Sequence, residues 1–468
     1  HAGCEAAAAA CRAGARTALV TQRRDTIGAM SCNPSIGGVG KGTLVREVDA
    51  LGGIIGRAAD EAGIQFRMLN RSKGPAVWGP RCQADRVLYA RAVQRLLGDE
   101  LGPRGLEIVE AGVEDLIWEK ATAPGPGPDA PRARVGGVVI AGGRQLRAAS
   151  VVVATGTFLR GRLLLGASAT EGGRVGERAS TALAEAFDRL GLPLGRLKTG
   201  TPPRLASQGI DWSVLEPQPG DAPPEPFSFL HDEVPHARRQ VLCHMGHTNE
   251  ETHAIVRDAA HLAPAHEGAE PRYCPSLDAK VRRFPGRAAH QVWLEPEGFP
   301  EHTSVVYPNG ISTALPPEVQ LRIVRSIRGL ERASIVQSGY AVEYDFVDPR
   351  ALTPALRVRA VEGLFLAGQV NGTTGYEEAA AQGVLAGANA ARLAKGLQPW
   401  TVSRAEGLIG VLVDDLVTRG ASEPYRMFTS RAEHRLRLRA ANADLRLTRA
   451  AQRVGLLDAA HPTDAERL

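Results

Sequence analysis

The chain has 468 residues, of which 43% are hydrophobic and 23% are charged, a composition typical of a globular protein with two or three domains. Its apolar runs are far too short to cross a bilayer, so we expect no membrane segment. Lys and Arg total 56 against 51 Asp and Glu, and this net charge of +5 allows a polyanionic partner without requiring one.

Six cysteines are scattered along the chain, and no two of them form a CxxC pair. A large protein with this cysteine usage is expected to be reduced and intracellular rather than secreted. The lack of a CxxC pair also argues against a disulfide reductase. The six residues are Cys4, Cys11, Cys32, Cys82, Cys243 and Cys274.

The N-terminal segment predicts a helix followed by a strand. Residues 1–16 are rich in Ala and end near Gly14, a pattern typical of a helix that packs closely on a sheet and stops at a glycine. Residues 17–21 then predict a short buried strand. We interpret this segment as the second half of a strand–turn–helix–strand unit whose first strand is absent.

Two more buried strands are predicted at residues 149–154 and 363–367, and each runs into a turn that contains glycine. A second helix of small residues is predicted from Glu377. Strands that end in glycine turns, with helices between them, predict a doubly wound α/β sheet.

The remaining segments indicate how the chain is divided into domains. Residues 121–137 are rich in Pro and Gly and predict a loose surface loop. Residues 205–330 lack a βαβ rhythm and predict an inserted α+β domain, and the pattern after residue 400 is helical and rich in Arg. We therefore predict an α/β domain in two parts, 1–204 and 331–400, an inserted domain at 205–330, and the start of a C-terminal helical region at 401–468.

The glycine turns predict a dinucleotide cofactor. In a Rossmann-like fold, the glycine-rich turn before the first helix lets backbone N–H groups meet a pyrophosphate, and Gly3 is what this chain has of such a turn. The turns after residues 149–154 and 363–367 are typical of two-dinucleotide-binding flavoproteins, and the helix start at 372–378 can direct its positive end at a flavin ring. FAD is favoured over NAD because the late strand and its helix serve the isoalloxazine end. The candidate FAD-binding residues are Gly3, Gly37, Gly38, Lys41, Thr155, Gly156, Gly368, Gln369, Asn371, Gly372, Thr373 and Thr374.

Two positions depart from standard nucleotide-binding patterns. An acidic residue is expected at the end of the second strand of a dinucleotide fold, but this position reads Thr21 and Gln22. The glycine-rich stretch at 37–43 is similar to a P-loop, but Ser35 stands in place of the first glycine and Gly42 follows Lys41. We therefore predict that this loop approaches the flavin and holds no nucleoside triphosphate.

Two cysteines lie in segments rich in Pro and polar residues, which predicts fixed loops rather than core positions. They are Cys32 in MSCNPS and Cys274 in PRYCPS, and Arg272 is placed to lower the pKa of the neighbouring thiol. Either thiol is a candidate nucleophile or acid, and the alternative is a passive buried cysteine. Cys243, His247 and His253 lack a second ligand pair with the usual spacing, so we predict no metal.

Ten segments together resemble the MnmG/GidA family, in the family's order. They are DTIGAMSCNPSIGGVGKG at 25–42, KGPAV at 73–77, KTGTPPR at 198–204, HTNE at 247–250, PRYCPS at 271–276, LEPEG at 294–298, YPNG at 307–310, EYD at 343–345, NGTTGYEEAAAQG at 371–383 and EPYRMFTSRAE at 423–433.

The resemblance implies a flavoenzyme that works on the wobble uridine of tRNA together with the GTPase MnmE. It implies that a carboxymethylaminomethyl or taurinomethyl group is installed on carbon 5. Methylenetetrahydrofolate would supply the carbon, an amine such as glycine or taurine the nitrogen, and NADH the electrons that reduce FAD. The resemblance also implies a homodimer, with tRNA contacts partly in the C-terminal helical region.

The same resemblance assigns roles to the two loop cysteines, because Cys32 and Cys274 match the family's cysteines. We expect Cys274 to add to carbon 6 of the uracil and Cys32 to give acid–base support. Four arginines are candidates for tRNA contacts, and if residues 435–439 form a strand their charges share one face. The alternative is a solvated charged face. These residues are Arg431, Arg435, Arg437 and Arg439.

Some features differ from the family's pattern or leave other functions open. The leading glycines before His1 and part of the C-terminal helical domain are expected to be missing, the segment before Pro271 is short, and His244 and Gly246 replace the usual Tyr and Thr. The alternatives are a folate- and FAD-dependent tRNA methyltransferase of the TrmFO type, a non-catalytic FAD-stabilised tRNA-binding scaffold, and an NADH oxidase. Residues 73–81 and 290–297 favour the mitochondrial branch over a bacterial cytoplasmic protein.

Overall fold

The computed structural model describes residues 1–120, 130–272 and 276–458. Its first elements are α1 (Ala2–Arg12) and β1 (Thr17–Thr21), as predicted, and β1 pairs in parallel with β5 (Leu106–Glu110). A second parallel pair joins β9 (Val151–Val153) to β21 (Leu364–Leu366). The predicted strands at 149–154 and 363–367 are therefore confirmed. The side chains of β21 are buried as predicted, but the predicted burial of β1 is wrong, because its side chains are half-buried or exposed, and in β9 only Val153 is buried.

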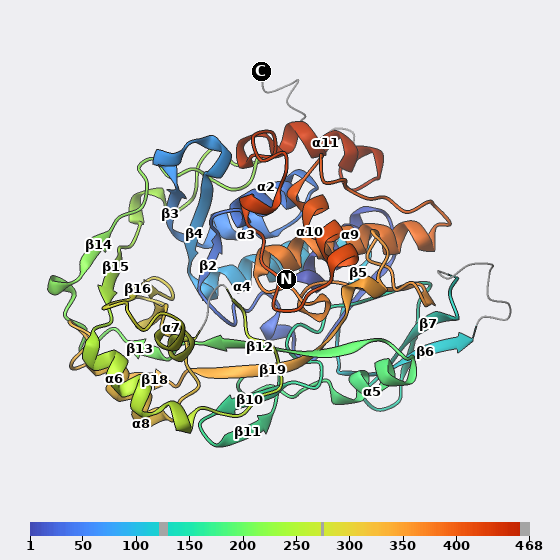
Figure 1. The fold of residues 1–468 in the computed structure, drawn as a ribbon. Helices are drawn as coiled ribbons and strands as arrows, with labels where there is room; N and C mark the ends of the chain where they lie inside the picture. Colours follow the sequence, from blue (N-terminus) through green and yellow to red (C-terminus); the bar gives the residue numbers. More distant parts are fainter. Residues whose placement is uncertain (121–129, 273–275, 459–468) are drawn as a thin grey trace.

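The two small-residue helices cross at very short range in the middle of the molecule. α9 (Tyr376–Ala394) packs on α1, and the N-terminus lies over this crossing in Figure 1. A Cβ atom added at Gly383 or Gly387 would lie 2.3 or 2.1 Å from a backbone oxygen of α1, so these positions require glycine. The predicted second helix is confirmed, and its small residues explain how it packs.

Two small sheets complete the dinucleotide part. One is built from β2 (Ser35–Gly37), β4 (Gly79–Ala84) and β3 (Gly63–Leu69) and is packed by α2 (Lys41–Ala50) and α3 (Ile55–Ala62), and α4 (Arg86–Arg95) packs on α3. The other is built from β6 (Val113–Lys120), β7 (Ala133–Ile140), β8 (Gln145–Arg147) and β20 (Val361–Glu362), and α5 (Thr181–Arg189) packs on β6.

The loop predicted at 121–137 is wrong in its last part. Residues 121–129 lie outside the described residues, but 133–137 belong to β7. The side chains of Val135, Val138 and Ile140 in this strand are buried against the core, and this apolar pattern outweighs the two glycines between them.

An antiparallel sheet connects this part to the rest of the molecule. Its strand order is β11 (Ser168–Glu171), β10 (Arg162–Leu165), β19 (Tyr340–Val347) and β12 (Leu194–Thr201), and its two long strands are β19 and β12. In Figure 1, β12 and β19 run across the lower half of the molecule, between β14 and β15 on the left and β6 and β7 on the right.

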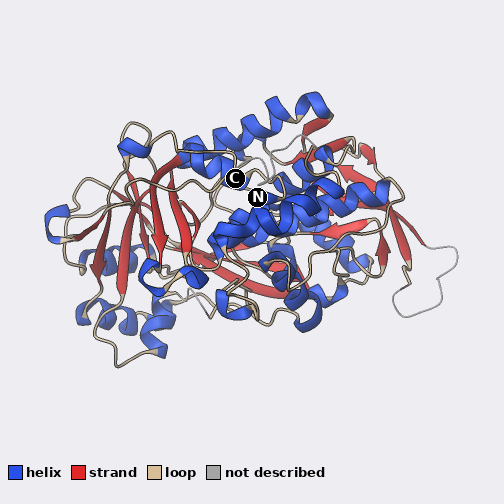
Figure 2. Ribbon diagram, turned by 90° about the horizontal axis from the view of Figure 1, so that it is seen from above, coloured by secondary structure: helices blue, strands red, loops and turns tan. Residues whose placement is uncertain are grey.

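The inserted region forms a six-stranded antiparallel sheet with its own apolar core. Its helices are α6 (Glu250–Asp258), α7 (Leu277–Arg283) and α8 (Pro317–Arg325). Figure 2 shows these strands and helices gathered at one end of the molecule. The strand order is β14 (Glu216–Gln218), β15 (Cys243–His247), β16 (Gln291–Pro296), β17 (Val305–Asn309), β13 (Arg204–Ala206) and β18 (Ile335–Gln337).

The C-terminal part is helical, with α10 (Leu408–Arg419) and α11 (Ala443–Arg453) packed on α2. The strand considered at 435–439 is wrong, because turns occupy this stretch and the N–H of Arg437 donates to the carbonyl of His434 over 2.8 Å. Within the described ranges, none of the helices has the length and apolarity needed to cross a membrane.

Candidate functional site

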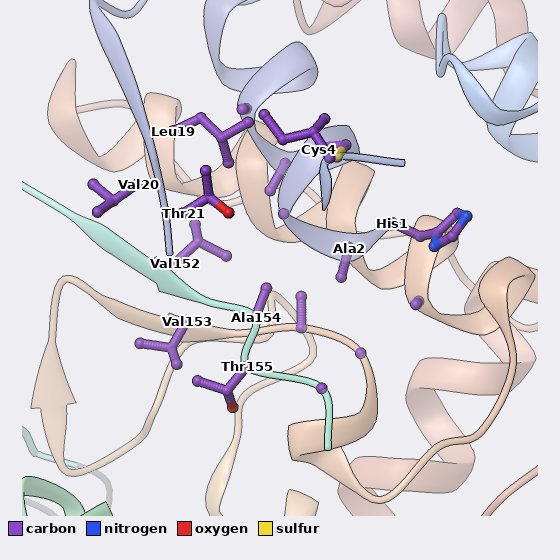
Figure 3. A pocket seen from close by; sticks show the side chains of 18 of the residues that line it. His1, Ala2, Cys4, Leu19, Val20, Thr21, Val152, Val153, Ala154 and Thr155 are labelled. Atoms are coloured by element: carbon purple, nitrogen blue, oxygen red, sulfur yellow. The ribbon is translucent and has the colours of Figure 1, made fainter. Parts of the chain in front are cut away.

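A cavity of about 1730 Å³ lies against α1, between the two parallel strand pairs, and extends to the loop that carries Cys32. Figure 3 shows Leu19 and Thr21 of β1, Ala2 of α1, and Ala154 and Thr155 after β9 around this space. The cavity follows the start of α1 and the turns after β9 and β21, where a Rossmann-like fold places a dinucleotide.

The start of α1 forms one wall with the properties of an anion site. His1, Ala2, Gly3 and Cys4 line the cavity, and Glu5 is the residue whose N–H makes the first helical bond, 3.0 Å from the carbonyl of His1. The amides before Glu5 are therefore free of intrahelical partners, and they carry the positive end of the helix dipole. This wall has the properties that a pyrophosphate site needs, and the FAD contact of Gly3 stays a prediction.

The turns after β9 and β21 form the adjoining wall, next to the start of α1. The Thr155 hydroxyl is buried and has no hydrogen-bond partner among the residues that the structure describes. Gly156 and Gly368 have φ of +58° and +90°, and a Cβ at Gly368 would lie 3.1 Å from the Cβ of Ala2. Both glycines and Gln369 line the cavity. A buried hydroxyl without a partner beside free helix amides is what a bound dinucleotide would satisfy, so these residues fit FAD.

The loop that carries Cys32 meets the start of α9 at the far end of the cavity. The N–H of Cys32 donates to the Tyr376 hydroxyl over 2.8 Å, and that hydroxyl lies 3.1 Å from the carbonyl of Asn33. Burial raises the pKa of Tyr376 far above its ordinary value, so its hydroxyl keeps its proton and donates to Asn33. The loop and the helix start, which are more than 300 residues apart in the chain, thus share one wall as the flavin hypothesis requires.

Lys41 lines the cavity, but its charge is engaged by protein groups. Its Nζ lies 2.9 Å from Glu377 and 2.8 Å from Glu378, and Glu377 also accepts from the N–H of Gly37 over 2.7 Å. Burial acts to lower the pKa of Lys41, but the two carboxylates outweigh it and raise the pKa above its ordinary value. Lys41 therefore holds the Gly37 loop on α9, a structural role that the sequence did not predict.

Four predicted FAD-binding residues lie behind the wall rather than in it. Asn371 and Thr373 are fully buried and both bond to Gln382, over 2.9 and 3.0 Å. A Cβ at Gly372 would lie 2.7 Å from the Cβ of Ala421, and Gly38 is absent from the part of the wall that the structure describes. In this turn Thr374 is the residue that faces the cavity, because the side chains before it point into the core.

Cys274 lies outside the described residues. On its N-terminal side, Pro271 lines the cavity and the N–H of Arg272 donates to Glu423 over 3.0 Å. The candidate metal ligands Cys243, His247 and His253 belong to no group of three or more ligands in the described part of the chain.

The four candidate tRNA-binding arginines differ in their surroundings. Arg431 stacks 4.1 Å from the ring centroid of Tyr425 and donates to the carbonyl of Arg426 over 2.7 Å, and Arg439 is half-buried. Arg435 and Arg437 are exposed. The structure therefore leaves two of the four available to a phosphate backbone without rearrangement.

Sequence reasoning missed two residues beside Cys32. Tyr307 lines the cavity with its hydroxyl 3.3 Å from the Cys32 thiol, and the buried Arg204 donates to the Cys32 carbonyl over 3.2 Å. Both stand inside segments that carried the family resemblance, which was the only signal available for them.

Comparison with known proteins agrees with this architecture. The family model described as glucose inhibited division protein A matches residues 1–398. The tRNA uridine 5-carboxymethylaminomethyl modification enzyme MnmG of Granulibacter bethesdensis is 56% identical over 461 residues, which cover 97% of this chain and 70% of that protein. Two crystal forms of Aquifex aeolicus GidA are 46% identical, with TM-scores of 0.90 and 0.91, and cover 98% of this chain and 72% and 75% of theirs. The predicted fold class is confirmed, and this chain belongs to the glucose-inhibited division protein A (GidA) family.

Proposed function

We propose that this chain is an FAD-dependent enzyme that modifies uridine in tRNA by adding a (carboxymethyl)aminomethyl or taurinomethyl group to carbon 5 of the wobble base. One observation carries the proposal: a single cavity joins free helix amides, suited to a cofactor phosphate, to the thiol of Cys32. Family membership and the name of the 56%-identical MnmG support the tRNA substrate.

The residues of the cavity have distinct tasks in this proposal. The amides of Ala2, Gly3 and Cys4 would hold the pyrophosphate, and the hydroxyl of Thr155 would bond a polar group of the cofactor. The positive end of α9 would favour the electron-rich edge of a bound flavin. Bound FAD would supply two-electron chemistry beside Cys32. The thiol of Cys32 gives acid–base support while the attacking role stays with Cys274, outside the described residues.

Several finer elements rest on the resemblance alone. They are the co-substrates NADH and methylenetetrahydrofolate, the MnmE-type GTPase as partner, the homodimer, and the mitochondrial location. Arg435 and Arg437 are the exposed candidates for tRNA phosphates.

The test combines cofactor binding with analysis of the product. The purified chain is titrated with FAD, and tRNA nucleosides from cells that lack the gene, complemented with wild type or Cys32→Ser, are measured by mass spectrometry. We expect flavin binding in both proteins and the aminomethyl nucleoside only with wild type. A methyl group without nitrogen would indicate the TrmFO-type reaction instead, and full modification by Cys32→Ser would remove this thiol from the chemistry.

A further inference from the structure

Three consecutive carbonyl groups before and at the thiol are held by two arginines. Arg86 donates to the carbonyl of Met30, and Arg204 donates to those of Ser31 and Cys32 over 3.4 and 3.2 Å. One buried carboxylate joins the two arginines, since Glu297 lies 2.6 Å from Arg86 and 3.0 Å from Arg204. We call Arg86, Glu297 and Arg204 the carbonyl clamp.

The carbonyl clamp and Tyr376 together fix the backbone of Cys32 on both sides. The clamp holds its carbonyl, and the Tyr376 hydroxyl accepts from its N–H over 2.8 Å. Two domains contribute to this arrangement, because Glu297 follows β16 of the inserted sheet whereas Tyr376 begins α9. A backbone held in this way directs the side chain to one place, and here that place is the cavity.

Tyr307 of β17 meets the thiol there. Its hydroxyl lies 3.3 Å from the Cys32 sulfur, and the Arg204 guanidinium carbon lies 4.7 Å from the centroid of its ring. A thiolate accepts a hydrogen bond from a phenol, and the bond is stronger than that of a neutral thiol because the acceptor is charged. A cation beside the ring adds to the phenol's polarity and attracts the thiolate's charge.

We propose that Tyr307 is a positioning residue that donates a hydrogen bond to the Cys32 thiolate. The carbonyl clamp fixes the Cys32 backbone and contacts the Tyr307 ring through Arg204. This arrangement makes Cys32 the reactive thiol among the cysteines that the structure describes. Only the use of this reactive thiol in tRNA modification rests on the proposed function. Cys4, Cys11, Cys82 and Cys243 are buried, which makes them internal references.

Alkylation of the chain by iodoacetamide tests the proposal without tRNA. The thiolate sulfur forms a bond to the methylene carbon, the carbon–iodine bond breaks and iodide leaves, so the rate reports thiolate availability. Peptide mass spectrometry follows each cysteine from pH 5 to 10 in wild type and in Tyr307→Phe, which keeps the ring over Arg204. We expect Cys32 of the variant to react about fivefold more slowly at pH 7, as the loss of one hydrogen bond to a charged group predicts.

The matched control is Tyr340→Phe, which removes another phenol from the same cavity wall, one whose hydroxyl bonds the backbone of Val175. Its Cys32 rate is expected to stay within about twofold of wild type. Equal rates in wild type and Tyr307→Phe, or an equal loss in both variants, overturn the proposal. If Tyr307→Phe slows alkylation while Cys32→Ser still modifies tRNA, the contact stands and the catalytic use of the thiol fails.

Discussion

Single buried polar groups show which residues of the cavity wall serve a ligand and which serve the fold. Thr155 and Thr157 both line the cavity two residues apart, but the hydroxyl of Thr157 donates to the carbonyl of Gly173 over 2.7 Å, whereas that of Thr155 has no partner in the described part of the chain. The structure therefore already uses one hydroxyl and leaves the other for a bound group.

This difference predicts opposite effects of the same substitution. Thr155→Val is expected to change the free energy of unfolding of the cofactor-free chain by less than about 1 kcal/mol and to weaken FAD binding about tenfold, because it removes a hydrogen bond that only the complex makes. Thr157→Val is expected to cost about 1–2 kcal/mol of stability, since it leaves the Gly173 carbonyl unpaired. Urea unfolding and flavin fluorescence titration measure both. A stability loss for Thr155→Val without a change in affinity would contradict this division.

Glu5 predicts a pH dependence of stability. Its carboxylate, 1% exposed, accepts from the N–H groups of Ile54 and Ile55 at the start of α3. Burial raises its pKa from 4.5 to about 7 in spite of those bonds. A carboxyl with a raised pKa in the folded state favours folding most when it is protonated, so its contribution is complete below pH 4.5 and is lost as the pH rises through about 7.

The corresponding experiment compares wild type with Glu5→Gln, whose amide stays neutral and keeps an oxygen acceptor. Between pH 4.5 and pH 8, the free energy of unfolding of wild type is expected to fall by about 3 kcal/mol relative to that of Glu5→Gln. Urea unfolding at four pH values measures this difference. Parallel curves for the two proteins would show that Glu5 does not titrate in this range.

At the scale of elements, the crossing of α1 and α9 holds the cofactor wall together. Gly387→Ala would place a Cβ 2.1 Å from the carbonyl oxygen of Ala6, and neither backbone can yield easily. We expect a loss of at least about 2 kcal/mol and weaker FAD binding, because α1 carries the phosphate-facing amides. Gly98→Ala is the control, since among the described atoms nothing lies within 4 Å of its added Cβ. Equal melting temperatures for the two variants would contradict the close crossing.

The elements around the cavity were largely predictable from local pattern, but their partners were not. Runs of Ala and Gly predicted α1 and α9, and apolar runs predicted β1, β9 and β21. No local signal pairs Lys41 with Glu377 and Glu378, so its charge was assigned to the cofactor. The alternation at 435–439 suggested a strand, but backbone bonds to His434 close turns there. A local sequence pattern indicates the secondary structure that a segment prefers, whereas contacts between distant segments decide what its side chains bind.

At the scale of the whole molecule, buried ion pairs join the inserted sheet to the dinucleotide part. Arg81 of β4 pairs with Glu295 of β16, which is 1% exposed, and Arg86 pairs with Glu297 in the carbonyl clamp. Both carboxylates lie at the end of the inserted sheet that faces the Cys32 loop. The sheet therefore takes part in the site, since its position sets that of the carbonyl clamp and Tyr307.

The ion pair between Arg81 and Glu295 predicts that the two side chains contribute to the free energy of unfolding in a strongly coupled way. Arg81→Met leaves a buried carboxylate without its cation and is expected to cost about 3–5 kcal/mol of stability. The double variant, Arg81→Met with Glu295→Gln, is expected to recover more than half of that loss, because no buried charge remains. Urea unfolding of wild type, both single variants and the double variant gives the coupling energy. Alkylation of Cys32 in the double variant then shows whether the sheet has kept its place, and a rate close to that of wild type is expected. A double variant whose loss equals the sum of the single losses would show that the two groups act independently and that apolar packing, rather than this ion pair, sets the position of the inserted sheet.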